Sequence, residues 1–155
     1  MTSASLLPCP PFPRAGQQRA YWRAPHSPSA MALAISQAAR QHDGLILAIT
    51  RDTHSASALE NDLRIVADDL PLLHFPDWET LPYDMFSPHP DIVSQRIAAL
   101  YRLPSITRGI LVVPVASLMQ RVSPPEWIAG NVLDLRKGQK LDLDQEKRRL
   151  EASGY

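Results

Sequence analysis

Two uninterrupted apolar runs of strand length, at residues 45–50 and 109–114, most restrict the folds open to this chain. Apolar side chains at nearly every position are typical of a strand covered on both faces. Segments with helical spacing of apolar residues separate the runs, and the connections are too long for hairpins. The pattern therefore predicts an α/β fold with a parallel sheet and right-handed crossovers.

Capping residues and prolines indicate where the remaining elements begin and end. Ser27 or Ser29 can cap a first helix that runs to about Gln41, and Asp52 or Thr53 can cap a second. The later predicted elements are a short strand at 72–75, a third helix capped by Asp91 that presents Val93, Ile97, Leu100 and Tyr101, and a short helix with Leu118 and Met119 that ends before Pro124.

The composition of the 155 residues excludes several classes of protein. Lys and Arg number 16 and Asp and Glu number 16, so the basic excess usual in nucleic-acid-binding proteins is missing. One cysteine excludes a disulfide framework and a cysteine zinc site. No apolar run approaches the roughly 20 residues that span a bilayer. We expect a cytoplasmic chain with no membrane partner and no direct nucleic-acid site.

Proline content and residue pattern predict three parts. Six of the 15 prolines fall within the first 28 residues, so residues 1–26 are predicted to form an extended lead-in. Residues 27–130 are predicted to form the α/β domain, which lacks strands needed to complete its sheet. Residues 131–155 are predicted to begin a second, inserted domain.

The predicted start of that second domain has its own local signals. Alternating apolar and polar residues predict a half-exposed strand at 132–141 with a turn at Lys137–Gly138. Asp142 and Gln145 then form a capping box for a charged helix, with Gly154 just past its end.

The segment before the first helix is where an α/β sheet would hold a phosphate. It reads RAPHSPSAM (23–31), without the glycine of a tight cradle and without a lysine for the phosphates. Pro25 and Pro28 each remove an N–H donor. We therefore expect no bound cofactor, metal or catalytic residue. A nucleotide-binding or hydrolysing domain with an atypical loop that uses Ser29 is the alternative hypothesis.

The loop after the short strand is the most informative stretch, because open α/β sheets carry functional loops at strand ends. The aromatic side chains of this loop can either pack against the core of their own domain or dock on a partner, and both interpretations stay open. We expect Trp78→Ala to cost about 3 kcal/mol and Arg96→Ala to cost less, because two rings would anchor the loop on the third helix. In that arrangement Trp78 and Tyr83 are the anchors, and Arg96 faces a carboxylate of Glu79 or Asp84. The candidate structural or interaction residues are Asp77, Trp78, Glu79, Tyr83, Asp84 and Arg96.

This loop and the residues after it resemble one protein family. The chain contains DWETLPYD (77–84), SPH (87–89), RG (108–109), VPV (113–115) and LMQRV (118–122). These motifs resemble the N-terminal region of the bacterial transcription-repair coupling factors (Mfd). The resemblance is dense over 77–122 and looser through KGQ (137–139), SGY (153–155) and Ala15–Gly16.

The resemblance implies a helicase-like domain similar to the repair protein UvrB, without its functional phosphate loop. It implies a non-catalytic interaction or regulatory module linked to recruitment of UvrA. The longer factor would couple stalled RNA polymerase to nucleotide excision repair. ATP and magnesium, RNA polymerase and double-stranded DNA would bind downstream parts of that factor. The chain thus looks like a fragment, and most UvrA-contact residues would lie beyond Tyr155.

Overall fold

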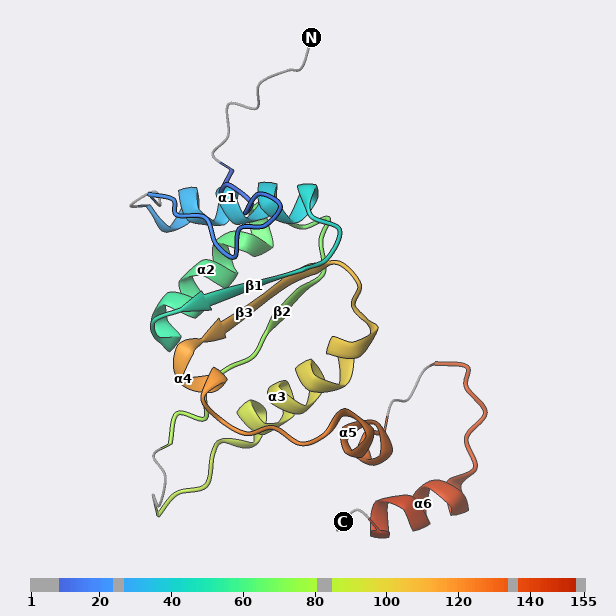
Figure 1. Ribbon diagram of the computed structural model, residues 1–155. Coiled ribbons are helices and arrows are strands. Elements are labelled where there is room, and N and C mark those ends of the chain that lie inside the picture. Colours follow the sequence, from blue (N-terminus) through green and yellow to red (C-terminus); the bar gives the residue numbers. More distant parts are fainter. Residues whose placement is uncertain (1–8, 24–26, 81–84, 134–136, 153–155) are drawn as a thin grey trace. The chain divides into compact units, whose positions relative to one another are not determined.

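The computed structural model describes residues 9–23, 27–80, 85–133 and 137–152 (Figure 1). The chain divides into two compact units between Arg121 and Val122. This division falls earlier than the domain boundary predicted at residue 130, and the three-part domain organisation stays a prediction.

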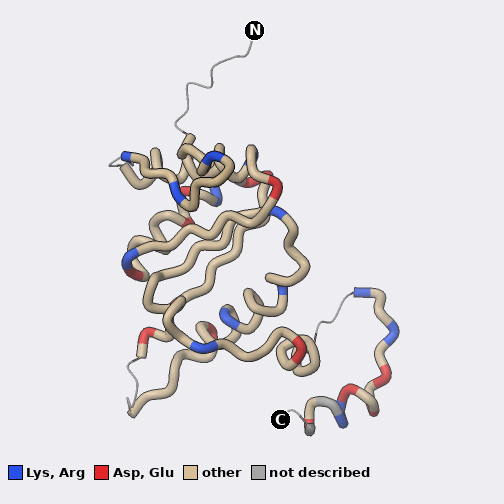
Figure 2. The backbone as a smooth tube through the Cα atoms, viewed as in Figure 1, with Lys and Arg blue, Asp and Glu red and all other residues tan. Residues whose placement is uncertain are grey.

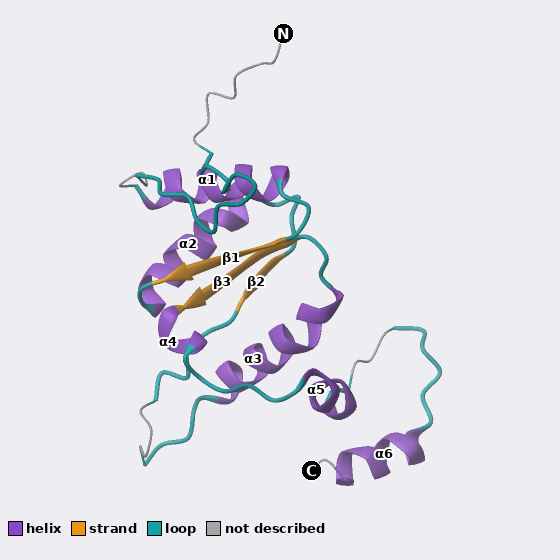
Figure 3. Ribbon diagram, viewed as in Figure 1, coloured by secondary structure: helices purple, strands orange, loops and turns teal. Residues whose placement is uncertain are grey.

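A three-stranded parallel sheet forms the centre of the first unit, in the order β1-β3-β2 (Figure 3). The strands are β1 (Leu45–Thr50), β2 (Leu72–His74) and β3 (Gly109–Pro114), close to their predicted bounds. None of the three contains Lys, Arg, Asp or Glu (Figure 2). The prediction of an α/β fold with a parallel sheet is confirmed.

Helices cover both faces of this sheet (Figure 1). Helices α1 (Pro28–Gln41) and α2 (Thr53–Val66) form one core with β1 and β3, in which Leu63 and Ile110 are fully buried. Helix α3 (Pro90–Arg102) forms the other core with β2 and β3. A short 3₁₀ turn, Leu103–Ser105, follows α3, and β3 leads into α4 (Val115–Leu118), the short helix predicted there.

The burial of β1 differs from the prediction. β3 is buried at all six positions, as expected for a strand covered on both faces. In β1, however, Leu47 and Ile49 are 46% and 56% exposed. These residues pair with β3 residues of the α3 core, but α3 packs against β2 and β3 and leaves the β1 edge open. The prediction of two-sided burial is therefore wrong for β1.

The helix starts follow the predicted capping chemistry with two corrections. Asp52 Oδ1 accepts a hydrogen bond of 2.7 Å from the Ser55 N–H at the start of α2, as predicted. Ser27 holds the cap position of α1, but its side chain makes no capping hydrogen bond. His89, not Asp91, caps α3, because its Nδ1 accepts from the Asp91 N–H at 3.3 Å. Asp91 lies in the first turn, where a negative charge suits the helix dipole.

The start of β3 needs a glycine. Gly109 has φ of +154°, and a Cβ there would lie 2.5 Å from the carbonyl oxygen of Pro71. That carbonyl accepts a hydrogen bond of 2.9 Å from the Ile110 N–H. The first ladder bond between β2 and β3 therefore forms where a side chain would collide with the neighbouring backbone.

The second unit contains α5 (Pro125–Asn131) and α6 (Leu143–Ala152). The strand predicted at 132–141 is wrong for residues 132–133 and 137–141, which are not in a strand. An alternating pattern forms a strand only where a partner pairs with it, and the described residues of this unit offer none. The predicted turn at Lys137–Gly138 is present.

The start of α6 confirms the Asp142 side of the predicted capping box. Asp142 Oδ1 accepts from the N–H groups of Asp144 and Gln145, both at 3.1 Å. Gly154, predicted just past the helix, lies outside the described residues. Among the helices in the described part of the chain, none has the length and apolar character needed to cross a membrane.

We expect Leu63→Ala to lower the free energy of unfolding by about 2–5 kcal/mol, because a fully buried leucine leaves a cavity. Ile65→Ala is the matched control on the same helix, since Ile65 is 78% exposed, and it should change stability by less than about 0.5 kcal/mol. Urea denaturation of both variants measures the difference. Equal losses in the two variants would contradict the assignment of the α2 core face.

Candidate functional site

The segments that follow β2 and β3 meet at the carboxyl edge of the sheet, where open α/β sheets carry their functional groups. Gln120 Nε2, after α4, donates to Asp77 Oδ1, after β2, at 2.9 Å. The Ser117 hydroxyl lies 3.5 Å from the same oxygen. Asp77 therefore joins two connections that are far apart in the sequence.

Arg96 of α3 is the centre of this cluster. The residue is only 3% exposed, and its guanidinium lies 4.0 Å from the ring centroid of Phe75 and 4.1 Å from that of Trp78. Both contacts have the geometry of a cation–π interaction, which gains strength when water is excluded. The guanidinium thus contacts both rings as a charged core residue.

Both terminal nitrogens of the Arg96 guanidinium donate hydrogen bonds. One terminal nitrogen donates to the carbonyl oxygen of Pro76 and the other to Gln120 Oε1, the latter at 2.9 Å. Burial lowers the pKa of Arg96 below its ordinary value, and the charge of Asp77 opposes that shift. Gln120 links the two charged groups, because its amide accepts from Arg96 and donates to Asp77. We call the residues Phe75, Asp77, Trp78, Arg96, Ser117 and Gln120 the Arg96 cluster.

One of the two carboxylates predicted to face Arg96, Glu79, is corrected, and the other is not described. Glu79 is exposed, has φ of +58° and forms no ion pair with Arg96 among the described contacts. Among the described residues, the acceptors of Arg96 are a backbone carbonyl and a side-chain amide. The other predicted partner, Asp84, and the predicted anchor Tyr83 lie outside the described residues. Trp78 does contact α3 through Arg96, while its role toward a partner stays a prediction.

Sequence reasoning missed Phe75, Ser117 and Gln120 as members of this cluster. One available signal is the spacing of α3, where Arg96 lies three residues after Val93 and so falls on the apolar face. The structure buries Arg96 and Ala99, whereas Ile97, one of the apolar residues predicted for this helix, is 38% exposed.

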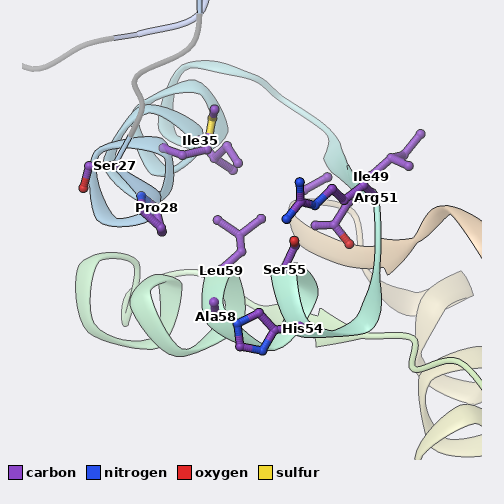
Figure 4. Close-up of a pocket in the computed structure, with 12 residues that line it drawn as sticks. Ser27, Pro28, Ile35, Ile49, Arg51, His54, Ser55, Ala58 and Leu59 are labelled. Carbon is purple, nitrogen blue, oxygen red and sulfur yellow. The ribbon is translucent and has the colours of Figure 1, made fainter. Parts of the chain in front are cut away.

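A second feature is a groove of about 480 Å³ between the start of α1 and the turn from β1 to α2 (Figure 4). Its lining includes the apolar side chains of Ile35, Ile49 and Leu59, with Arg51 and His54 near the start of α2. The alternative hypothesis of nucleotide binding applies to this groove, since it borders the segment searched for a phosphate loop.

Several polar groups around this groove are paired with one another. The Ser29 hydroxyl donates to Asp62 Oδ2 of α2 at 3.0 Å. Asp52 occupies the N-terminus of α2, and Arg51 pairs with it at 2.8 Å. The hydrogen bonds from Ser55 are the main cause that lowers the pKa of Asp52, so this carboxylate is ionised at neutral pH. A negative side chain at a helix N-terminus takes the position that a phosphate would need.

Metal ligation has no support in the described part of the chain. Across residues 9–23, 27–80, 85–133 and 137–152, no group of three His, Cys, Asp or Glu side chains is arranged to hold a metal ion.

The chain is similar to transcription-repair-coupling factors from several bacteria. No protein-family model matches the chain. The chain is 46% identical over 129 residues to the transcription-repair-coupling factor of Haemophilus influenzae and 39% identical over 142 residues to that of Escherichia coli. It is 30% identical over 129 residues to that of Staphylococcus aureus strain USA300. These alignments cover 83%, 92% and 83% of this chain but only 11%, 12% and 11% of the relatives.

We expect Arg96→Lys to lower the free energy of unfolding by about 1–3 kcal/mol. Lysine keeps the charge but has no planar fork, so it cannot stack between Phe75 and Trp78 and serve both acceptors. The sequence predicts a larger loss of stability for Trp78→Ala than for Arg96→Ala. Because Arg96 is almost completely buried, we expect Arg96→Ala to lower the free energy of unfolding at least as much as Trp78→Ala does. Urea denaturation measures these differences.

Arg102→Lys is the control for this prediction, because Arg102 lies on the same helix and is exposed. It should change stability by less than about 0.5 kcal/mol. If Arg96→Lys proved as stable as this control, the guanidinium would not hold the loop in place.

Proposed function

We propose that this chain, which is homologous to one segment of the bacterial transcription-repair coupling factors, acts as a non-catalytic interaction module within such a factor. In this proposal the sheet is a UvrB-type, helicase-like domain without a functional phosphate loop. Residues 131–155 begin an insert that is linked to recruitment of UvrA. RNA polymerase, double-stranded DNA, ATP and magnesium bind other parts of the longer factor.

The burial of Arg96 is the observation that carries this proposal. A catalytic arginine has to reach a substrate, but this one is 3% exposed and donates to Pro76 and Gln120. Asp77 Oδ1 likewise accepts from Gln120. The groups at the carboxyl edge therefore support a loop and leave little capacity for chemistry on a bound molecule. A loop held in this way loses less conformational entropy when it docks on a partner.

The alternative, a nucleotide-binding or hydrolysing domain, is favoured by one observation. The 480 Å³ groove lies beside Ser27 and Arg51 and is large enough for a small ligand. The pairing of Ser29 with Asp62 and the carboxylate of Asp52 at the α2 N-terminus weigh against phosphate in that groove.

A thermal shift measurement with Mg-ATP separates the two functions. Ligand at 100 times its dissociation constant would stabilise the fold by about 2.7 kcal/mol, which raises the melting temperature by several degrees. We expect no shift. A shift that is lost in Arg51→Gln would overturn the non-catalytic assignment in favour of a nucleotide site in this groove.

The interaction role is tested in a full-length coupling factor that carries this segment. Below the unfolding temperature, we expect Arg96→Lys to reduce recovery of UvrA on stalled RNA polymerase, because the loop is held less firmly. The rate of ATP hydrolysis should stay unchanged, and Arg102→Lys should behave as the parent. Loss of ATP hydrolysis with normal UvrA recovery would contradict the proposal.

A further inference from the structure

The segment before α1 leads along that helix (Figure 1). Near the start of the segment, the Phe12 ring stacks on His42 at the C-terminal end of α1, with the ring centroids 5.9 Å apart. The chain then returns to the N-terminal end of the helix, which begins at Pro28. Residues 13–23 therefore lead from one end of this 14-residue helix toward the other.

All charged residues of this segment are basic. Residues 9–23 contain Arg14, Arg19 and Arg23 and no lysine or acid (Figure 2). Helix α1 contains no acid either, and the first acid of the chain, Asp43, comes after it. The three arginines are exposed, and no ion pair or side-chain hydrogen bond joins them to another residue that the structure describes. The net charge of zero over the whole chain thus conceals a local positive surface.

Two neighbouring aromatic rings lie between the last two of these arginines, in the sequence RAYWR (19–23). Tyr21 is 84% exposed and Trp22 is 36% exposed. Neither residue belongs to the two hydrophobic cores, and neither ring makes a stacking or cation–π contact with another described residue. Exposed rings of this kind offer their faces to a flat group of a ligand.

The combination of free arginines and free rings selects the chemistry of a partner. An acidic peptide would pair with the arginines but would leave the ring faces unused. Binding to a lipid surface relies on apolar side chains that enter the acyl region, and residues 9–23 contain no Leu, Ile, Val or Met. A single nucleic-acid strand supplies phosphates for the arginines and unpaired bases for the rings.

We propose that the segment 14–23 binds single-stranded DNA. Unpaired bases stack on Tyr21 and Trp22, and the three arginines contact the phosphates on either side of them. The proposal departs from the expectation of no direct nucleic-acid site, because that expectation used the charge balance of the whole chain. It is independent of the proposed function, since it uses none of the homology to the coupling factors.

The test is a fluorescence anisotropy titration of the full chain against a labelled oligothymidylate of about ten nucleotides. We expect saturable binding whose logarithm falls with the logarithm of the salt concentration, with a slope of about −2 for three phosphate contacts. A DNA duplex of the same length has no free base faces, so it should bind at least about 5-fold more weakly. Oligouridylate RNA of the same length tests the sugar, and we expect it to bind no more tightly than the DNA.

Variants separate stacking from charge. Tyr21→Ala should weaken binding by about 5-fold or more, because stacking of a base on a ring contributes on that scale. Phe86→Ala is the matched control, since Phe86 is 79% exposed on another loop, and it should bind as the parent does. Arg19→Gln should reduce the salt slope by about 0.7, whereas Arg102→Gln should leave it unchanged. Because Tyr21 and Arg19 are exposed, urea denaturation should show parental stability for both variants.

Four results would overturn the proposal. The first is a parent chain that does not bind the oligonucleotide, and the second is a Tyr21→Ala variant that binds as tightly as the parent. The third is duplex DNA or RNA that binds more tightly than the single DNA strand. The fourth is equal or tighter binding of polyglutamate or of phosphatidylglycerol vesicles, which would identify an acidic peptide or a lipid surface as the partner.

Discussion

The first unit depends on the burial of β3 between two layers of helices. Successive residues of a strand point to opposite faces, so one strand supplies side chains to both cores. Ile110 and Val112 pack with α1 and α2, whereas Leu111 and Val113 pack with α3. The groups at the carboxyl edge depend on the same strand, because the segment that carries Gln120 continues directly from β3 through α4.

The elements that local chemistry determines could be predicted from the sequence. The caps and apolar runs placed α2 and β3 correctly, since a capping carboxylate and a continuous apolar run act within a few residues. The error at β1 has a different origin. Leu47 and Ile49 are apolar, as is typical of a strand that is covered on both faces. Which strand lies at the edge, however, depends on the sheet order. The alternation at 132–141 fails for a related reason, because a strand needs a partner.

The contacts of the Arg96 cluster could be predicted from the sequence only in part. Charge alone predicts a loop carboxylate, Glu79 or Asp84, as the partner of Arg96, and Asp84 lies outside the described residues. The actual acceptors lie 20 and 24 residues away, and one of them is a backbone carbonyl, which has no sequence signature. Two aromatic rings also contact the guanidinium. Only the tertiary arrangement brings these groups together.

The strand order has a consequence for how the chain folds. β1 and β2 do not pair with each other, and residue 45 finds its partner only at residue 109. During synthesis both strands must therefore remain unpaired until β3 has left the ribosome. Such non-local pairing slows folding, because the entropy of closing a long loop is lost before the contacts form. The chain is thus most exposed to aggregation after β2 is made and before β3 is available.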